Sequence, residues 1–278
     1  MQCPVVLPDG AVRGTTLTRG VDTGGPSQGP SPTRPQHGPA GSTAPGGSWP
    51  AVAVMMLVHM PPGQRLWGWS RVVRGASALR GTPGLRFVRA LGSGYEGGFG
   101  VRPSWDRQGL FTLFDGEADA MRFVHESAAA AAYRRHADEM FVAVLRASSA
   151  RGSWGGMQIA VTAQPDPAGP VVALTRASIR PSKAAEFWSH TPASQASLEA
   201  ADGCRLAVGL GEAPYLRQCT FSVWDSVAAM TAYSRGGAHG EAARQSLTLG
   251  WFSEWMFVRF VPLAMDGTWK GRSFGPAA

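Results

Sequence analysis

The sequence predicts an α+β fold made of two tandem ferredoxin-like repeats that form an internal pseudo-dimer. The first observation is a self-match with a period of about 110 residues, in which residues 111–115 (FTLFD) and 221–225 (FSVWD) each precede a helical pattern. Each copy then reaches a Met-Phe-Val strand, at Met140 and at Met256. The second observation is the element order β-α-β-β-α-β in both halves. Two such units, packed face to face with sheet on sheet, would bury the apolar face that each sheet has on its own, with a cavity beside or between the sheets.

The first half begins with residues 51–60, the longest strongly apolar stretch, which is far too short to span a bilayer and reads as a strand. Residues 64–80 place apolar side chains near helical spacing with arginines between them, which favours a helix that covers the sheet. The alternative is an interfacial helix whose Trp67 and Trp69 reach lipid headgroups. The remaining elements of this half are strands at 85–91 and 109–114, a long helix at 116–139 and a strand at 140–146.

The second half repeats this order after a turn-rich linker, residues 156–170. Its expected elements are strands at 171–179, 206–210, 218–224 and 255–262, with helices from 183 to beyond 190 and from 226 to 247. The first domain is therefore expected at 51–155 and the second at 171–270, with a tail at 271–278.

Residues 1–50 are expected to be a disordered N-terminal extension. They are rich in Gly, Pro, Ser and Thr and lack a periodic apolar pattern, so they bury too little surface to offset the entropy of ordering. They also lack the apolar run of a signal peptide. We interpret this extension as dispensable for the folded protein.

Charge and cysteine usage restrict the classes of partner. The net charge of +7 rests almost wholly on arginine, because Lys183 and Lys270 are the only lysines. No run of five like charges and no basic stripe with interleaved aromatic residues occurs, which argues against nucleic-acid binding. The charge favours an anionic membrane surface or an acidic electron carrier. Cys3, Cys204 and Cys219 have no metal-ligand spacing, and their odd number suits a reducing cytosol. We therefore expect a cytoplasmic protein, and its positive charge is compatible with peripheral contact to the inner face of the cell membrane.

The two repeats differ at one position that matters for chemistry. In the second repeat His239 follows Asp225 by 14 residues, whereas the first repeat has Ala129 at the matching place. The fold is therefore expected to be duplicated and the chemistry one-sided. The glycine-rich residues 92–100 lack the Gly-Lys-Ser/Thr of a phosphate loop and are expected to form a lid or a wide hairpin.

Several blocks of the chain resemble the spheroidene monooxygenase family of carotenoid biosynthesis. The resemblance covers roughly residues 66–269. The blocks that carry it are TPGLRFVRALGSGYEGGF (82–99), LTRASIRPSKAAEFW (174–188) with its Arg176, and 209–260, which contains GLGE (209–212), TFSVW (220–224) and GWF (250–252). The resemblance implies a haem-dependent oxygenase that introduces a keto group beside the methoxy end of an acyclic carotenoid. It also implies O2 as the oxidant and reduced ferredoxin as the electron donor.

The second-half helix also resembles the haem-degrading and antibiotic-biosynthesis monooxygenases of the dimeric α/β-barrel class. That resemblance implies His239 as the axial ligand of the haem iron, because a neutral imidazole ligates iron well. It places the cofactor beside Arg217, Phe221, Trp224 and Met230, with Phe221, Val223, Met230 and Phe252 as an apolar wall. Arg176 and Gln218 are the candidate catalytic residues.

Each of these residues also has a purely structural interpretation. Arg176 on a buried strand needs a partner, and pairing with Glu212 is favoured over a haem propionate. Arg217 and Gln218 would orient a propionate or a distal water. His125 and His136 have polar neighbours, which favours solvated positions over iron ligation. The alternative functions are a cofactor-free α/β-barrel monooxygenase or apolar-ligand-binding protein, and a structural pseudo-dimer without a ligand.

Overall fold

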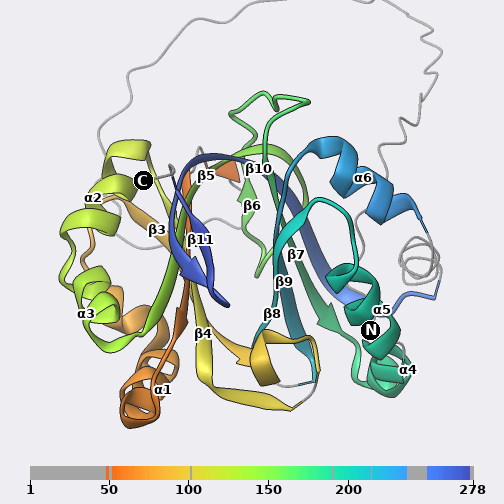
Figure 1. Ribbon diagram of the computed structural model, residues 1–278, viewed down its shortest axis with the longest axis horizontal. Coiled ribbons are helices and arrows are strands. Elements are labelled where there is room, and N and C mark those ends of the chain that lie inside the picture. The colour runs from red at the N-terminus through yellow and green to blue at the C-terminus, as the bar shows by residue number, and fades with distance from the viewer. Residues whose placement is uncertain are drawn as a thin grey trace, which may run out of the picture.

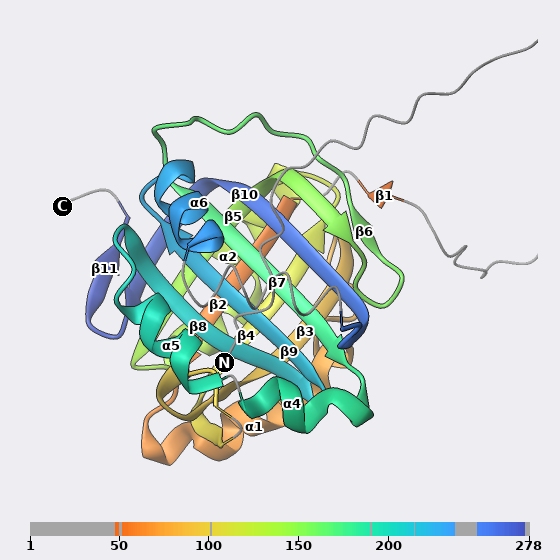
Figure 2. The same cartoon turned by 90° about the vertical axis from the view of Figure 1, so that its right-hand side faces the viewer.

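The protein, a computed structural model, is described for residues 48–49, 52–100, 102–189, 191–213, 215–236 and 249–275. Its strands form a closed barrel, and its helices lie on the outside of that barrel in two groups (Figure 1, Figure 2). The strand order is β11-β10-β5-β2-β4-β3-β8-β9-β7, and β7 also pairs with β10, which closes the ring. The tandem ferredoxin-like fold of the dimeric α/β-barrel type is confirmed.

Each half has the predicted β-α-β-β-α-β order. The first half contains β2 (Val52–His59), α1 (Arg65–Arg74), β3 (Leu85–Gly94), β4 (Pro103–Phe114), α2 (Glu117–Glu126), α3 (Ala128–His136) and β5 (Glu139–Gly152). The second contains β7 (Val171–Ile179), α4 (Ala184–Ser189), α5 (Thr191–Glu199), β8 (Cys204–Ala213), β9 (Arg217–Trp224), α6 (Val227–Arg235) and β10 (Phe252–Trp269). Short elements complete the fold: β1 (Ser48–Trp49), β6 (Gln158–Ile159), β11 (Arg272–Phe274), and the 3-10 turns η1 (Pro62–Gln64), η2 (Gly75–Leu79), η3 (Tyr95–Gly97) and η4 (Pro181–Lys183).

The two sheets join edge to edge, and not face to face as we expected. Closure pairs the exposed backbone groups of the edge strands, which an open sheet would leave to solvent or to another chain. The two junctions differ in length. Along one, β5 and β10 pair from Phe141 to Gly152, with two register shifts on β10. Along the other, β3 and β8 pair at Gly92 with Gly211 and at Ser93 with Leu210. One seam of the barrel is therefore long and the other short.

The barrel interior is filled by apolar side chains. Alternate residues of each strand point inward, as in β2, where Ala53, Met55 and Leu57 are fully buried. Trp154 enters the barrel from the turn after β5 and stacks on Phe111, with ring centroids 5.4 Å apart. The barrel interior is thus the main hydrophobic core of the described residues.

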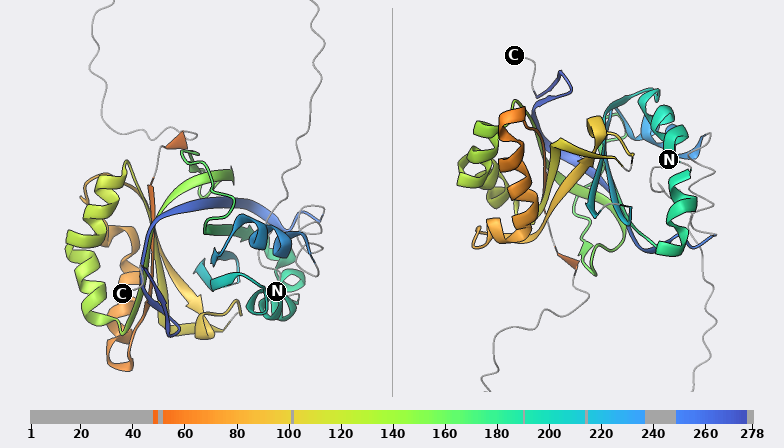
Figure 3. Two further views of the ribbon diagram at one scale, coloured as in Figure 1. Left: turned by 45° about the horizontal axis from the view of Figure 1, so that its top comes forward. Right: turned by 90° about the horizontal axis from the view of Figure 1, so that it is seen from below.

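The opposite strand faces are covered by the helices. One cluster packs α1, α2 and α3 against β2, β4 and β5 through residues such as Phe114, Phe123 and Tyr133. A second cluster packs α5 and α6 against β7 and β9 through residues such as Trp224 and Met230. Figure 3 shows the two helical groups on opposite sides of the barrel. No helix in the described residues is long and apolar enough to cross a membrane.

Local differences from the predicted elements have simple causes. The expected long helix at 116–139 is two helices, because Ser127 has extended backbone angles and its hydroxyl caps α3 at the Ala130 N–H. Most strands are longer than expected, above all β10, which has 18 residues. Ser48–Trp49, within the expected extension, pairs in parallel with β6. The second half of the expected helix at 226–247 lies outside the described residues.

Candidate functional site

A groove lies at the short seam, on the outer face of β3, β8 and β9. It contains about 770 Å³ of empty space, part of which is open solvent. Its lining residues are Trp69, Val72, Gly92, Ser93, Gly94, Gly98, Phe99, Gly100, Pro103, Trp188, Gly209, Leu210, Gly211, Glu212, Ala213, Tyr215, Arg217 and Gln218. The groove exists because β3 and β8 separate after two residue pairs.

Glycines leave the floor of the groove almost without side chains. Gly92 in β3 faces Gly211 in β8 across the seam. The turn that follows η3 lies directly on this floor, since a Cβ added to Gly209 would come within 2.4 Å of the Gly98 carbonyl oxygen. The buried Ser93 hydroxyl donates to the Gly209 carbonyl oxygen at 2.7 Å and ties the two strands together. Gly209 is therefore needed for the close approach of this turn, whereas Gly92, whose added Cβ would meet only the Gly211 carbonyl oxygen at 3.9 Å, leaves a part of the floor that an apolar molecule can contact at backbone distance.

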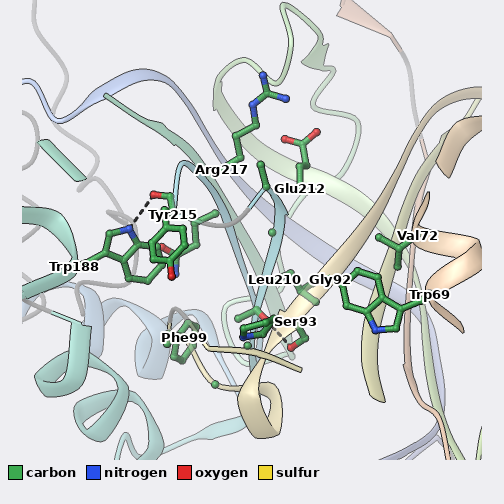
Figure 4. Close-up of a pocket in the computed structure, with 18 residues that line it drawn as sticks. Trp69, Val72, Gly92, Ser93, Phe99, Trp188, Leu210, Glu212, Tyr215 and Arg217 are labelled. Carbon is green, nitrogen blue, oxygen red and sulfur yellow. Dashed lines mark hydrogen bonds between the residues drawn. The ribbon is translucent and has the colours of Figure 1, made fainter. Parts of the chain in front are cut away.

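Aromatic side chains form the sides of the groove. Figure 4 shows Trp69 and Val72 of α1 on one side, and Trp188 of α4 with Tyr215 on the other. The Trp188 Nε1–H donates to the Tyr215 carbonyl oxygen at 2.8 Å, which fixes the indole in place. Tyr215 itself has a φ of 66°, a left-handed conformation that is uncommon for a non-glycine residue. The lining is mainly apolar, with polar groups at one edge.

Those polar groups include Arg217 and Gln218 at the start of β9. Gln218 is buried and Arg217 exposed. The same Arg-Gln pair occurs 110 residues earlier, at Arg107 and Gln108. This spacing equals the period of the internal repeat, so the two pairs occupy equivalent positions. In the first half, however, α1 covers Gln108, since a Cβ on Gly68 would approach the Gln108 Nε2 to 2.7 Å. Only the second-half glutamine lines the groove among the described residues.

Arg176 is held by two carboxylates at the end of the barrel. Its Nη2 lies 3.0 Å from Glu212 Oε2, and its Nη1 binds Glu254, so the predicted pairing with Glu212 is confirmed. Arg89 of β3 binds the other oxygen of Glu212 at 2.7 Å. The side chain of Arg176 is 4% exposed and lies over the Trp154 ring. This network neutralises the buried guanidinium and joins the two halves across the short seam.

Glu254 illustrates the electrostatics of this network. Burial acts to raise the pKa of the Glu254 carboxyl, but hydrogen bonds from the Gly156 and Gly155 N–H groups and from the Ser153 hydroxyl, together with Arg176, bring this pKa below its ordinary value. The carboxylate is therefore ionised throughout the neutral range. Of the network, Glu212 also lines the groove.

The other predicted cofactor residues do not line the groove. Phe221 points into the barrel core, whereas Trp224 packs with Met230 of α6 on the opposite face of the sheet. The expected apolar wall of Phe221, Val223, Met230 and Phe252 is not formed, because strand alternation separates the first two from Met230, and Phe252 packs on Phe187.

The candidate histidines are likewise not found in the described lining of the groove. His239 lies in residues 237–248, outside the described part of the chain. His125 is exposed on α2, and His136 stacks on Trp67 with its Nδ1 2.7 Å from Gln64 Oε1. The described lining of the groove suits a porphyrin by its glycine floor, its aromatic sides and the guanidinium of Arg217, but it contains no histidine or cysteine. An iron ligand would have to come from another segment.

Comparison with known proteins gives a consistent result. A protein named spheroidene monooxygenase from Rubrivivax gelatinosus is 54% identical over 249 residues, which are 86% of this chain and 95% of the relative. A protein of the same name from Rhodobacter capsulatus is 38% identical over 210 residues, 74% of this chain and 87% of the relative. No protein-family model matches the chain. Among solved structures, an aldoxime dehydratase has a TM-score of 0.47 at 11% identity, covering 76% of this chain and 81% of that one.

Proposed function

The chain belongs to the spheroidene monooxygenase family, and we propose that it is a haem-dependent member that introduces a keto group into an acyclic carotenoid. The observation that carries the proposal is the apolar, glycine-floored groove at the short seam of the barrel. A monooxygenase inserts one atom of O2 into its substrate and reduces the other to water.

The groove fits one end of a long apolar molecule. Its sides are aromatic, its floor is backbone, and part of its volume is open to solvent, so that the rest of a polyene can remain outside. Trp69 and Trp188 would hold the chain of conjugated bonds between two flat surfaces. The buried amide of Gln218 is the group we propose to orient the polar end of the substrate or a water molecule.

The conversion of a methylene to a carbonyl needs two insertions of oxygen. Each insertion uses one O2, two electrons and two protons and releases one water, and the resulting geminal diol loses a further water to give the ketone. We propose reduced ferredoxin as the source of the electrons, since the net charge of +7 favours an acidic electron carrier. Haem iron, when bound, would supply the activation of O2.

The chain's own residues would hold the cofactor as follows. His239 is the proposed axial ligand, and Arg217 the proposed partner of a propionate. Trp224 and Met230 pack α6, which ends at Arg235 and leads toward His239, so we assign these two residues a positioning role. Phe221 backs β9 from inside the barrel. Arg176 would act through Glu212 and not on the substrate.

The test is an absorption spectrum of protein expressed with a haem supply, recorded for the wild type, His239→Ala and His125→Ala. We expect a Soret band in the wild type and in His125→Ala, whose side chain is exposed, and its loss in His239→Ala. Turnover of spheroidene to a ketone with ferredoxin, reductant and O2 would then establish the substrate. The absence of a Soret band in all three proteins would exclude the haem mechanism and favour a cofactor-free barrel that oxidises or binds an apolar ligand.

A further inference from the structure

Helix α1 exposes a stripe of large apolar side chains to solvent. Leu66 is 88% exposed and Val73 is 80% exposed, and their spacing of seven residues places both on one face of the helix. Trp69 lies one turn from Leu66 and contacts Trp105 of β4, with ring centroids 5.2 Å apart. Trp105 is itself 63% exposed. Contiguous exposed groups of this size usually mark a surface that binds something.

The stripe is flanked by cationic groups. The sequence of α1, RLWGWSRVVR, contains three arginines and no acidic residue. By their angular positions on the helix, Arg65 lies on one side of the stripe and Arg74 on the other. Arg65 is paired with Asp106 at 3.0 Å, and Arg71 lies over the inward-facing Trp67, so Arg74 is the arginine of α1 that borders the stripe without an acidic partner among the described residues. Trp67, which the alternative interpretation of the sequence placed at lipid headgroups, faces inward against Tyr133 and His136. An outward apolar stripe between arginines is the pattern of a helix that lies in a membrane interface.

This surface continues into the groove. Trp69 and Val72 of α1 line one side of the groove, while the other side ends in Tyr215 and Leu216, which are both exposed. Figure 3, seen from below, shows α1 and α4 on either side of the β3–β4 connection at this end of the barrel. Exposed apolar groups therefore border the mouth of the groove from both halves of the chain.

We propose that this end of the molecule docks on an anionic lipid bilayer, with Leu66, Val73 and Trp105 in the interface and Arg74 against the headgroups. Charge complementarity selects this occupant, because Arg74 borders the apolar stripe and the whole chain carries a net charge of +7, both of which favour anionic headgroups. The proposal rests on the proposed function in one respect, that the ligand of the groove is dissolved in lipid. Docking brings the mouth of the groove to that ligand without passage through water.

The test is co-sedimentation of the full chain with vesicles of phosphatidylglycerol and phosphatidylcholine, and with vesicles of phosphatidylcholine alone. We expect binding to the anionic vesicles that weakens as salt is added. The double variant Leu66→Asp, Val73→Asp should lower the partition coefficient by at least about tenfold, because it removes two apolar anchors and adds repulsion. Neither side chain packs in a described core cluster, so circular dichroism should show an unchanged fold.

Two further variants make the test specific. Val161→Asp changes a half-exposed valine in the connection between β6 and β7. This connection lies at the end of the barrel opposite α1 in Figure 1 and Figure 2, so the variant should bind anionic vesicles as the wild type does. Arg74→Gln should lower binding to anionic vesicles several-fold. Equal binding by the double variant and the wild type would overturn the proposal, as would no binding by the wild type. A change of mass in light scattering for the double variant would point to a second copy of the chain as the true occupant. Vesicle binding needs neither haem nor carotenoid, so its outcome is separate from that of the Soret experiment.

Discussion

Substitution of Gly209 by alanine tests whether the floor of the groove depends on backbone packing. The added Cβ would lie 2.4 Å from the Gly98 carbonyl oxygen and 2.9 Å from the Phe99 Cα. An ordinary contact begins near 3.4 Å, so the turn after η3 would have to move by about 1 Å. Phe99 resists this movement, since its side chain is buried and its N–H is bonded to Gln195 Oε1 at 3.2 Å.

We expect Gly209→Ala to lower the free energy of unfolding by about 1 to 3 kcal/mol, the usual cost of overpacking. A value near 2 kcal/mol corresponds to a change of roughly 30-fold in the folding equilibrium constant. Urea unfolding followed by tryptophan fluorescence measures this directly, provided that the slope with denaturant is unchanged.

Gly92→Ala is the matched control, because it adds the same methyl group to the same floor. Its Cβ would meet only the Gly211 carbonyl oxygen at 3.9 Å, an ordinary contact. We expect no loss of stability there, and a gain of about 0.4 to 1 kcal/mol is allowed by the lower entropy of the unfolded chain. Equal effects of the two substitutions would refute the idea that the turn packs on the floor at Gly209.

Three other predictions concern the charged network and the cysteines. Arg176→Leu leaves the carboxylates of Glu212 and Glu254 without their shared cation and should cost about 3 kcal/mol or more of unfolding free energy in urea titrations; a cost below about 1 kcal/mol would contradict the assigned pairing. Because the pKa of Glu254 is lowered in the folded state, its contribution is present above the unfolded pKa of about 4.3 and is lost as the pH falls through the folded value. The urea midpoint of the wild type should thus converge on that of Glu254→Gln between about pH 5 and pH 3. If the two midpoints instead depended on pH in the same way, the pKa of Glu254 would not be lowered by folding. Burial raises the pKa of the Cys204 thiol to about 11, so iodoacetamide at pH 8 should modify Cys204 far more slowly in folded protein than in urea; equal rates would show that the thiol is accessible.

The fold was predictable because its signals are local and occur twice. The FTLFD and FSVWD segments, each at the end of a strand and before a helix, fix the corresponding strands β4 and β9. The break in the expected helix at 116–139 also has a local signal. Ser127, in the run His-Glu-Ser-Ala, is a typical helix N-cap, and its hydroxyl caps α3 at the Ala130 N–H.

The site was less predictable because it is made largely of backbone. Glycines such as Gly92, Gly209 and Gly211 have no side-chain chemistry to recognise, and they lie next to one another only after β3 and β8 meet. One correction was available from the sequence. Phe221 and Trp224 are three residues apart on one strand, an odd spacing that places them on opposite faces, so they could not both line one wall.

The unequal seams also determine where the barrel can open. Parting β3 from β8 breaks the hydrogen bonds of a short ladder, whereas parting β5 from β10 breaks those of a ladder that extends from Phe141 to Gly152. Local opening should therefore be concentrated at the short seam, and amide hydrogens that bond across the β3–β8 seam should exchange with deuterium faster than those that bond across the β5–β10 seam. A homodimer related by exact two-fold symmetry must present the same sequence on both sides of each seam. A single chain is free of that constraint, so the two strands that meet at one seam can differ in sequence, as β3 and β8 do here.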